Sequence, residues 1–474
     1  MRQPGDILLI SCYELGQQPL GIAVAAARLE AEGFLPDLMD ISVESFDAEK
    51  ARRASLVGIS VPMHTALRLG MRVAQRVRSV NPRCHISFYG LYAALNAEHL
   101  LETVADSCFG GEFEDGLVRV STALHDGGDT GPFTHPPDVA AEVRGARRTK
   151  RTVLVPSRKG LPPLERYVAL VDRGERRKVG YVTTTRGCKH LCLHCPVPSV
   201  YEGAFFATPT GVVLDDISQL VASGATHITF GDPDFLNGPT HARRTVRAMH
   251  GCFPSLTFDY TAKVEHLLAQ RALLCELREL GCAFVVSAIE SLSDATLSNL
   301  AKGHCRRDVV ALIELFRDMG LVLRPSLLPF TPWDTIVDYR DLLGLIEDSG
   351  MVDHVDPVQY GIRLLVPPGS PLVRSRAMRP HLEGVDHDRL THRWRHPDPG
   401  MDALQRDVAR VTEEAAASGE DVAVTFYRIK HLAHSAPGTE TRHAVDTPGP
   451  RPGVPDLYPA DRVKPPRLSE NWFC

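Results

Sequence analysis

Residues 183–196 read TTTRGCKHLCLHCP, and this stretch holds the densest cluster of metal-binding side chains in the chain. It follows a run of residues typical of a buried β-strand. Cys188, Cys192 and Cys195 fall within eight residues, so their thiolates can converge on one soft metal centre. Gly187 gives the backbone the freedom to turn there. Three local ligands, rather than four, predict an iron–sulfur cluster that keeps one iron open to a substrate.

Zinc is an alternative occupant of these thiolates, with His190 or His194 as a further ligand. Zinc ribbons usually bring a second pair of cysteines from a distance, and the sequence has no second Cys-x-x-Cys. The isolated cysteines elsewhere are most simply small buried apolar residues, but that interpretation does not explain a cluster of three. The pattern therefore favours an iron–sulfur cluster over zinc and over ordinary core cysteines.

Strand-like and helix-like runs alternate around and after this stretch, which is typical of a (β/α) barrel. Such barrels place their chemistry at the carboxyl ends of the strands. Six units fit a partial or full barrel within residues 161–371. The expected strands are Tyr181–Thr185, His227–Phe230, Leu256–Tyr260, Phe284–Ile289, Leu321–Leu328 and Val358–Leu365.

The first part of the chain shows the same alternation of strands and helices. We expect an N-terminal doubly wound domain over residues 1–124, in which helices cover both faces of a parallel sheet. A linker rich in Gly, Pro and Asp is expected at 125–160. The fold class is therefore α/β, with this domain followed by a partial (β/α)6 barrel and a C-terminal extension.

The alternation of strand-like and helix-like runs weakens after the expected barrel. We expect a C-terminal α/β extension at 372–434, with a helix at Asp402–Ala417 and a strand at Val422–Tyr427. The Pro-rich tail at 435–474 is expected to be poorly ordered over much of its length.

Composition excludes several classes of protein. A net charge of −5 gives no sign of a nucleic-acid partner. No run reaches the roughly 18 apolar residues that a membrane-spanning helix needs. The 11 cysteines form an odd set in a long chain without an export signal, which argues against a disulfide framework. We therefore expect a soluble, cytoplasmic protein with no membrane partner.

A Cys-x-x-x-Cys-x-x-Cys stretch after a first barrel strand resembles the signature of the radical S-adenosylmethionine (SAM) superfamily. The resemblance implies a four-iron four-sulfur cluster on Cys188, Cys192 and Cys195, with the amino and carboxylate groups of SAM on the open iron. It implies that an electron from the reduced cluster cleaves the sulfonium and yields a 5′-deoxyadenosyl radical. A reductant such as ferredoxin or flavodoxin is then an expected partner.

Further motifs extend the resemblance over about residues 161–371. Phe230-Gly-Asp-Pro-Asp-Phe235 lies where the superfamily holds the SAM amino group. Asp232 is the closest match to that group and Asp234 the second choice, while a simple Asp-Pro turn is the alternative. Lys263 follows the third strand, where the resemblance implies a contact with the SAM carboxylate.

Two stretches after the fourth strand resemble the superfamily's "IES…KGH" pair. Ile289-Glu-Ser291 ends that strand, and Lys302-Gly-His304 follows it. The resemblance places Glu290 against the ribose of SAM. It also places His194, directly before the last cysteine, near the adenine. Val-Pro-Pro-Gly-Ser-Pro at 366–371 matches the element that follows the sixth strand in these proteins.

The N-terminal domain resembles the cobalamin-binding domain that precedes many radical SAM cores. Residues 18–23 (QPLGIA) resemble its opening and residues 109–114 (FGGEFE) its end. The Asp-x-His-x-x-Gly motif of such domains is absent, and the loop at residues 12–16 holds no histidine. Two interpretations stay open: cobalamin bound through backbone and loop contacts, or a degenerate scaffold. No G-x-G-x-x-G follows the first strand, which disfavours a dinucleotide domain.

The last residues, Asn-Trp-Phe-Cys474, resemble the end of the radical SAM proteins described by a CUAEP or CCAEP tail. In that group Trp-Phe-Cys is followed by selenocysteine or cysteine and then Ala-Glu-Pro. The resemblance implies a UGA codon read as a stop after codon 474. It also implies a catalytic or metal-binding role for the Cys474 thiol, a soft ligand and strong nucleophile.

Together these features predict a radical SAM enzyme that acts on a small-molecule or peptide substrate, in specialised biosynthesis or metalloid chemistry. Cobalamin would favour methyl transfer, and its absence would favour hydrogen abstraction or transfer of another SAM fragment. The alternative from another class is an iron–sulfur or zinc protein that serves as a sensor or carrier without SAM turnover. Glu290 and the Lys302–His304 stretch argue against that alternative.

Overall fold

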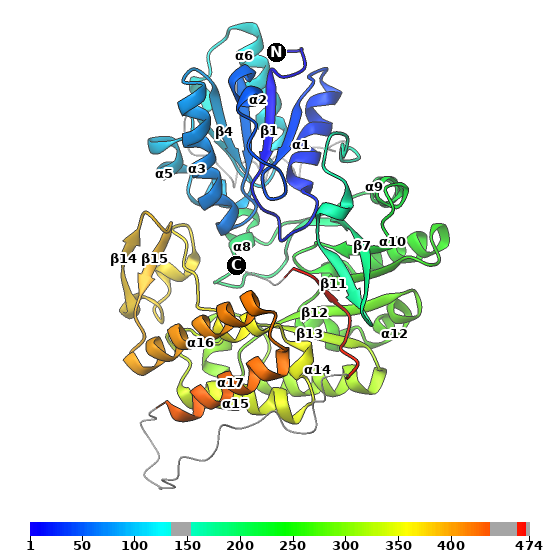
Figure 1. Ribbon diagram of the computed structural model, residues 1–474, viewed down its shortest axis with the longest axis vertical. Helices are drawn as coiled ribbons and strands as arrows, with labels where there is room; N and C mark the ends of the chain where they lie inside the picture. Colours follow the sequence, from blue (N-terminus) through cyan, green and yellow to red (C-terminus); the bar gives the residue numbers. More distant parts are fainter. Residues whose placement is uncertain (134–152, 437–461, 471–474) are drawn as a thin grey trace.

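The N-terminal sheet has five parallel strands in the order β2-β1-β3-β4-β5 (Figure 1). The computed structural model describes residues 1–133, 153–436 and 462–470. Every residue of β1, β3 and β4 is buried, as expected for strands covered on both faces. The predicted doubly wound architecture is thus confirmed. The strands are β1 (Ile7–Ser11), β2 (Asp37–Asp40), β3 (Leu56–Ser60), β4 (His85–Tyr89) and β5 (Ser107–Phe109).

Helices cover both faces of this sheet because alternate side chains of each strand point in opposite directions. Ile7 and Leu9 pack with the apolar residues of α1 and α6. Leu8 and Ile10 pack with those of α2, α3, α4 and α5 on the other face. These helices are α1 (Leu20–Ala31), α2 (Ala48–Arg53), α3 (His64–Val80), α4 (Leu91–Leu95), α5 (Ala97–Thr103) and α6 (Glu114–Asp126).

The second sheet is the half-barrel, in the order β13-β12-β11-β10-β7-β6-β16. Strands β7 and β10 to β13 pair in parallel, whereas β6 runs antiparallel to β7. The carboxyl ends of the parallel strands therefore share one edge, which is where the functional side chains lie. The bounds are β6 (Ala169–Asp172), β7 (Glu175–Val182), β10 (His227–Phe230), β11 (Thr257–Thr261), β12 (Cys282–Glu290), β13 (Val322–Leu327) and β16 (Arg467–Leu468).

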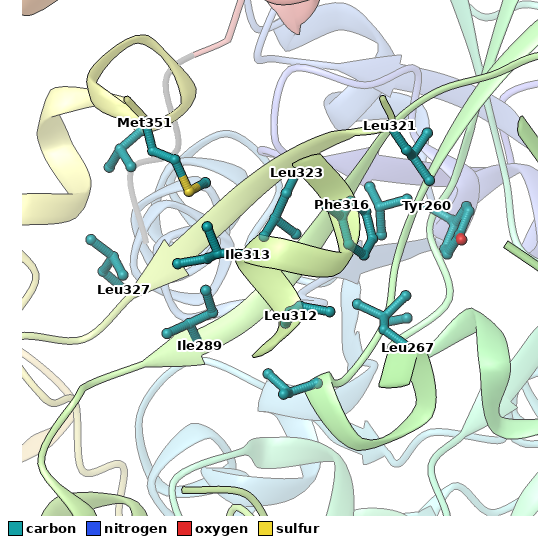
Figure 2. Packing of buried hydrophobic residues seen from close by; sticks show 14 of the residues in the cluster. Tyr260, Leu267, Ile289, Leu312, Ile313, Phe316, Leu321, Leu323, Leu327 and Met351 are labelled. Atoms are coloured by element: carbon teal, nitrogen blue, oxygen red, sulfur yellow. The ribbon is translucent and has the colours of Figure 1, made fainter. Parts of the chain in front are cut away.

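The largest hydrophobic core lies between the outer face of this sheet and its covering helices. Figure 2 shows Leu312 and Phe316 of α14 in this core, together with Ile289 of β12 and Leu323 of β13. The barrel helices that contribute to this core are α9 (Thr210–Ala222), α10 (Pro239–Cys252), α11 (Val264–Ala269), α12 (Arg271–Glu279), α14 (Arg306–Met319) and α15 (Ile336–Asp348). Helix α8 (Pro196–Tyr201) follows the cysteine loop, and α13 (Asp294–Asn299) follows β12.

The C-terminal extension adds a hairpin and two helices beside the barrel (Figure 1). The hairpin strands β14 (Leu382–Asp386) and β15 (Thr391–Trp394) pair antiparallel. Helix α16 (Pro399–Ser418) packs against α17 (Val422–Ser435), and α17 packs against α15. A small ladder of β8 (Thr185–Gly187) and β9 (Phe205–Ala207) flanks the cysteine loop.

The predicted sixth barrel strand, Val358–Leu365, is wrong for most of its length. Residues Pro357–Gly361 form a 3₁₀ turn, and only Arg363 makes a parallel bridge, with Phe330. The amide N–H of Leu327 donates to the side-chain Oε1 of Gln359 at 2.9 Å. The side chain of Gln359 thus accepts a backbone hydrogen bond at the outer edge of β13, where a sixth strand would have paired.

The predicted strand Val422–Tyr427 is also wrong, because these residues begin α17. Asp421 caps this helix by accepting the N–H of Ala423 at 2.9 Å. The buried residues Val422, Phe426, Ile429 and Ala433 recur at helical spacing. The alternation at 422–427 is thus a local pattern inside a longer helical one.

Parts of three predictions fall outside the described residues: the linker at 125–160, the tail at 435–474 and the role of Cys474. Among the described segments, no helix has the length and apolar character needed to cross a membrane.

Candidate active site

The cysteine loop connects β7 to α8 at the carboxyl edge of the half-barrel. Its turn requires glycine at position 187, where φ is +75° and a Cβ atom would lie 2.2 Å from the carbonyl oxygen of Ala204. Cys188 and Cys192 are buried and Cys195 is half-buried. The structure therefore holds all three predicted ligands on one short loop.

The surroundings of these thiols fit an iron–sulfur cluster. The side-chain Nδ2 of Asn237 lies 3.4 Å from the Sγ of Cys188, close enough to donate a hydrogen bond to sulfur. Burial raises the pKa of the Cys195 thiol to about 12, and the charges of Cys192 and Cys188 add to the rise. Burial likewise raises the pKa of Cys188, so both of these thiols are costly to ionise without a cation, and iron supplies one.

Asp232 holds the start of this loop in place. Its carboxylate accepts hydrogen bonds from the N–H of Thr184 at 3.0 Å, from the hydroxyl of Thr184 at 2.8 Å and from the hydroxyl of Thr185. Burial raises the pKa of Asp232 to about 6, although these hydrogen bonds oppose the rise. The predicted contact of Asp232 with the SAM amino group stays a prediction, since the three hydrogen bonds already engage both oxygens.

Glu290 and His194, which the resemblance assigned to the ribose and the adenine of SAM, lie side by side, and their roles toward SAM stay predictions. Glu290 ends β12 after a register shift and has φ +67°, a left-handed conformation that is costly for a non-glycine residue. Its Oε1 accepts from the Nζ of Lys302 at 3.0 Å and lies 3.3 Å from the Nε2 of His194. The strained backbone thus aims a carboxylate at the imidazole that precedes Cys195.

The charge state of Glu290 follows from this contact. Burial opposes ionisation, but Lys302 and His194 hold the pKa of Glu290 well below its ordinary value. Glu290 is therefore an ionised acceptor at physiological pH, as a contact with a ribose hydroxyl requires. The Nδ1 of His194 is buried and has no hydrogen-bond partner among the described residues. This imidazole keeps an unused polar atom beside the cysteine loop.

Asp234 and Lys263 lie with two histidines, apart from Glu290. Lys263 donates to the Nδ1 of His190 at 3.0 Å, and the Nε2 of His190 lies 3.3 Å from the Nε2 of His266. The Nδ1 of His266 lies 2.8 Å from the Oδ2 of Asp234. The structure thus gathers on one polar cluster the two residues that the resemblance assigned to the neighbouring amino and carboxylate groups of SAM, and their roles toward SAM stay predictions.

The sequence-based prediction missed His266 and Asn237. His266 follows Lys263 by three residues at the start of α11, so helical spacing was an available signal. Asn237 follows Asp234 by three residues in a 3₁₀ turn, where such spacing also aligns side chains. Neither residue belongs to a recognised motif, so nothing in the sequence alone separated them from solvated loop residues.

The N-terminal domain meets this site through α4 and α8. Leu91 and Ala94 of α4 pack against the cluster that contains Cys188 and Tyr201. Glu112, which follows β5, accepts from the hydroxyl of Tyr201 at 3.0 Å and lies 3.5 Å from Arg186 of the loop. The carboxyl edge of the first sheet therefore faces the carboxyl edge of the second across the cysteine loop.

Residues 182–343 match the model of the Radical SAM superfamily. This segment covers β7 to β13, including the cysteine loop and Glu290. The chain thus carries a radical SAM domain, and that domain implies a four-iron four-sulfur cluster and SAM.

Curated relatives match part of the chain. The ribosomal protein uS12 methylthiotransferase RimO of Geotalea uraniireducens (strain Rf4) is 25% identical over 181 residues, which are 36% of this chain and 40% of the relative. RimO of Methylococcus capsulatus (strain ATCC 33009 / NCIMB 11132 / Bath) is 24% identical over 270 residues, or 52% of this chain and 60% of the relative. The chain thus spans about half the length of these relatives.

Solved structures share the two-domain fold. The radical SAM methyltransferase TsrM from Kitasatospora setae, with cobalamin and a [4Fe-4S] cluster bound, has a TM-score of 0.58 at 18% identity, covering 73% of this chain and 71% of TsrM. The cobalamin-dependent SAM radical enzyme OxsB with aqua-cobalamin has a TM-score of 0.62 at 12% identity, covering 85% of this chain and 66% of OxsB. At these identities the likeness concerns the fold alone.

Proposed function

We propose that this chain, whose residues 182–343 form a radical SAM domain, is an enzyme that reductively cleaves SAM to start radical chemistry on an unidentified substrate. The observation that carries the proposal is the arrangement at the carboxyl edge of the half-barrel. Three thiols lie on one loop, and His194 of the same loop, directly before Cys195, contacts a separate ionised carboxylate, Glu290. A metal-binding protein without SAM turnover does not need the ionised Glu290 and its contact with His194.

Cys188, Cys192 and Cys195 would hold the cluster, which when bound supplies the electron for cleavage of the sulfonium. Asn237 would donate a hydrogen bond to the sulfur of Cys188, and such bonds tune reduction potentials. Asp232 fixes the loop by bonding Thr184 and Thr185 at its base. These residues keep the thiols in position before any substrate arrives.

Glu290 would accept a hydrogen bond from the ribose of SAM. Lys302 keeps that carboxylate ionised, and His194 orients it from the opposite side. Because Lys302 is itself buried, the Glu290–Lys302 pair is a fixed element of the site rather than a surface contact. The free Nδ1 of His194 is a hydrogen-bonding atom available to the adenine.

The proposed function includes cobalamin in the N-terminal domain. Its strand order changes direction between β1 and β3, and sheets of this order bind ligands at that switch point. The loop after β1 offers no imidazole, and Glu14 accepts the N–H groups of Leu20 and Gly21 at the start of α1. Cobalamin would therefore be held there by loop and backbone contacts, since the loop after β1 supplies no histidine. Methyl transfer is the reaction class that this cofactor would support.

Cluster binding is tested by anaerobic reconstitution of the full chain with iron and sulfide. We expect four irons per chain and a charge-transfer band at about 400 nm. Replacement of Cys188, Cys192 and Cys195 together by Ala should abolish the band, whereas Cys252→Ala, on an exposed cysteine of α10, should leave it intact. A band of unchanged intensity in the triple variant would contradict the proposal.

Cobalamin binding is tested separately. The reconstituted protein is mixed with hydroxocobalamin, passed through a desalting column and assayed for cobalt. One cobalt per chain is the expected result. Less than a tenth of an equivalent would remove cobalamin and methyl transfer from the proposal, and it would leave SAM cleavage untouched.

A further inference from the structure

One polar cluster beside the cysteine loop has no part in the proposed function. His190 lies between the first two cysteines of the loop, Asp234 follows β10, and His266 lies in α11. One ligand atom from each of the three residues lies within 4.8 Å of the other two. Three different elements thus bring two imidazoles and a carboxylate to one point.

The carboxylate of Asp234 is the least expected member. The side chain is fully buried, and its Oδ1 accepts the N–H of Leu236 at 3.1 Å. Its Oδ2 has no hydrogen-bond partner within residues 1–133, 153–436 and 462–470. A buried carboxylate oxygen without such a partner is costly, so a missing cation or donor is indicated.

The contact with His266 does not meet this need. The Nδ1 of His266 lies 2.8 Å from the Oδ2 of Asp234, yet neither atom makes a well-directed hydrogen bond to any described residue. One metal ion bound by both atoms would satisfy these two unpartnered atoms at once. The spacing suits this interpretation, because donors bound at about 2.0–2.2 Å to one ion lie about 3–3.5 Å apart.

The third donor is His190, whose Nε2 lies 3.7 Å from the Oδ2 of Asp234. Its 3.3 Å contact with His266 is to the other ring nitrogen of that residue, Nε2. Binding of an ion at Nε2 requires the proton of His190 to lie on Nδ1, so the Lys263 ammonium, which donates to Nδ1 at 3.0 Å, must give up this contact. Glu265, whose Oε2 already pairs with Lys263 at 2.8 Å, can retain the ammonium when it does so.

We infer that His190, Asp234 and His266 bind one divalent first-row transition-metal ion, distinct from the cysteine-bound cluster. Two imidazoles and one carboxylate form a donor set that suits zinc or iron(II) and leaves at least one position for an outside ligand. That position lies next to the cysteine loop. The site is thus placed to hold an oxygen or sulfur group of a substrate near the reaction.

The first test uses the cluster-loaded full chain. Iron is quantified, and the protein is titrated with Zn²⁺ against a chromophoric chelator. We expect one zinc per chain in addition to the cluster iron. His266→Ala and Asp234→Asn should weaken binding of this zinc by at least about 100-fold, since each removes a direct ligand. The matched control is His431→Ala, which removes an exposed histidine of α17 and should leave binding unchanged.

The second test uses the Cys188→Ala, Cys192→Ala, Cys195→Ala variant with Co²⁺, so that no thiolate of the loop can bind the ion. Visible bands of a nitrogen- and oxygen-bound cobalt, without intense sulfur-to-cobalt charge transfer, are expected. Their loss on adding His266→Ala supports the site. Zinc binding by His266→Ala equal to that of the unmodified chain, or the absence of any zinc beyond the cluster, overturns the inference. This variant cannot form the cluster, so the site and the proposed function fail independently.

Discussion

Glu290 shows how a single residue can carry both strain and charge. Its left-handed backbone and its burial are both unfavourable, and the Lys302 ammonium at 3.0 Å offsets them. Strained residues of this kind cluster at functional sites, so the arrangement indicates a functional carboxylate at the end of this barrel strand. The sequence predicted this residue from its motif, but the strained φ and the contact with His194 needed the structure.

Replacing Lys302 by Met should therefore destabilise the protein. The change leaves Glu290 buried without its cation, and breaking a buried pair in this way costs about 3–5 kcal/mol. Urea unfolding followed by circular dichroism measures the loss. The double variant Lys302→Met, Glu290→Gln should recover most of the stability. If the double variant were as unstable as the single one, the ion pair would not be the cause.

The raised pKa of Glu14 predicts that the free energy of unfolding depends on pH. Burial raises its pKa from 4.5 to about 7, against the opposing N–H groups of Leu20 and Gly21. Because the folded state holds the proton more tightly, this stability contribution is complete below about pH 4.5 and is lost as the pH rises through 7. A shift of this size corresponds to about 3 kcal/mol.

The Glu14→Gln variant removes this titration. Relative to it, the unmodified chain should lose about 3 kcal/mol of unfolding free energy between pH 4 and pH 8. Urea midpoints of both proteins across that range provide the measurement. The difference in unfolding free energy between the two proteins could instead stay constant with pH, or the unmodified chain could gain stability relative to the variant as the pH rises. Either result would rule out a raised pKa of Glu14.

At the scale of elements, strand β16 extends the half-barrel sheet beyond β6 as its last strand. It runs antiparallel to β6 and hence in the same direction as the parallel strands. Leu468 packs inside the barrel with Val179, Phe284 and Val322. Beyond the strand, the Oε1 of Glu470 accepts from the hydroxyl of Tyr13 at 2.8 Å. The described tail thus leads from the barrel to the first loop of the N-terminal domain (Figure 1).

Truncation of the chain after residue 461 should expose β6. The N–H of Ala169 would lose the hydroxyl of Ser469 at 3.0 Å, and Leu468 would leave the barrel interior. Hydrogen–deuterium exchange should then speed up by at least about tenfold across β6, which becomes an edge strand. Strand β10, paired on both sides, serves as the internal control. Equal protection of β6 in both proteins would mean that β16 does not cover it in solution.

The sequence predicted the elements with strong periodicity well, and it predicted the edge strands of the half-barrel sheet poorly. The parallel strands were predictable because both faces are buried and the runs are nearly all apolar. Strand β16 was not, because Arg467-Leu468 is too short for any pattern and pairs with a segment about 300 residues away. The predicted sixth strand was wrong because a side chain, Gln359, takes the place of a backbone partner, and no alternation pattern reveals that.

At the scale of the whole molecule, Arg158 joins the two domains. Its guanidinium binds both carboxylate oxygens of Asp216 in α9, at 2.6 and 2.9 Å. It also donates to the side chain of Gln18 in the first domain at 2.9 Å and to the carbonyl of Tyr181 in β7 at 2.7 Å. One buried cation thus fixes the orientation of the first sheet relative to the barrel.

Arg158→Met should loosen this junction and cost about 3–5 kcal/mol, since Asp216 is left buried and unpaired. We expect a lower thermal midpoint and faster limited proteolysis between the domains. The double variant Arg158→Met, Asp216→Leu removes both charges and should restore the thermal midpoint more than the protease resistance, because Gln18 still lacks its donor. Unchanged proteolysis in the single variant would contradict a clamping role.

The candidate site was predictable to the extent that one loop or one strand end carries it. The cysteines and the pair Glu290 and His194 follow from local motifs. The cluster of His190, Asp234 and His266 does not, because three separate elements supply it and only the folded barrel sets their distances. The junction at Arg158 could likewise not be predicted, since its partners come from three separate segments of the chain.

The central claim is that this protein cleaves SAM at a cluster held by Cys188, Cys192 and Cys195. The most direct test incubates the anaerobically reconstituted full chain with SAM and dithionite and quantifies 5′-deoxyadenosine by chromatography. We predict that 5′-deoxyadenosine forms with the unmodified chain, falls at least about tenfold with Glu290→Gln, and is absent with the triple cysteine-to-alanine variant. A fully loaded cluster that yields no 5′-deoxyadenosine, or equal yields from the triple variant, would contradict the claim.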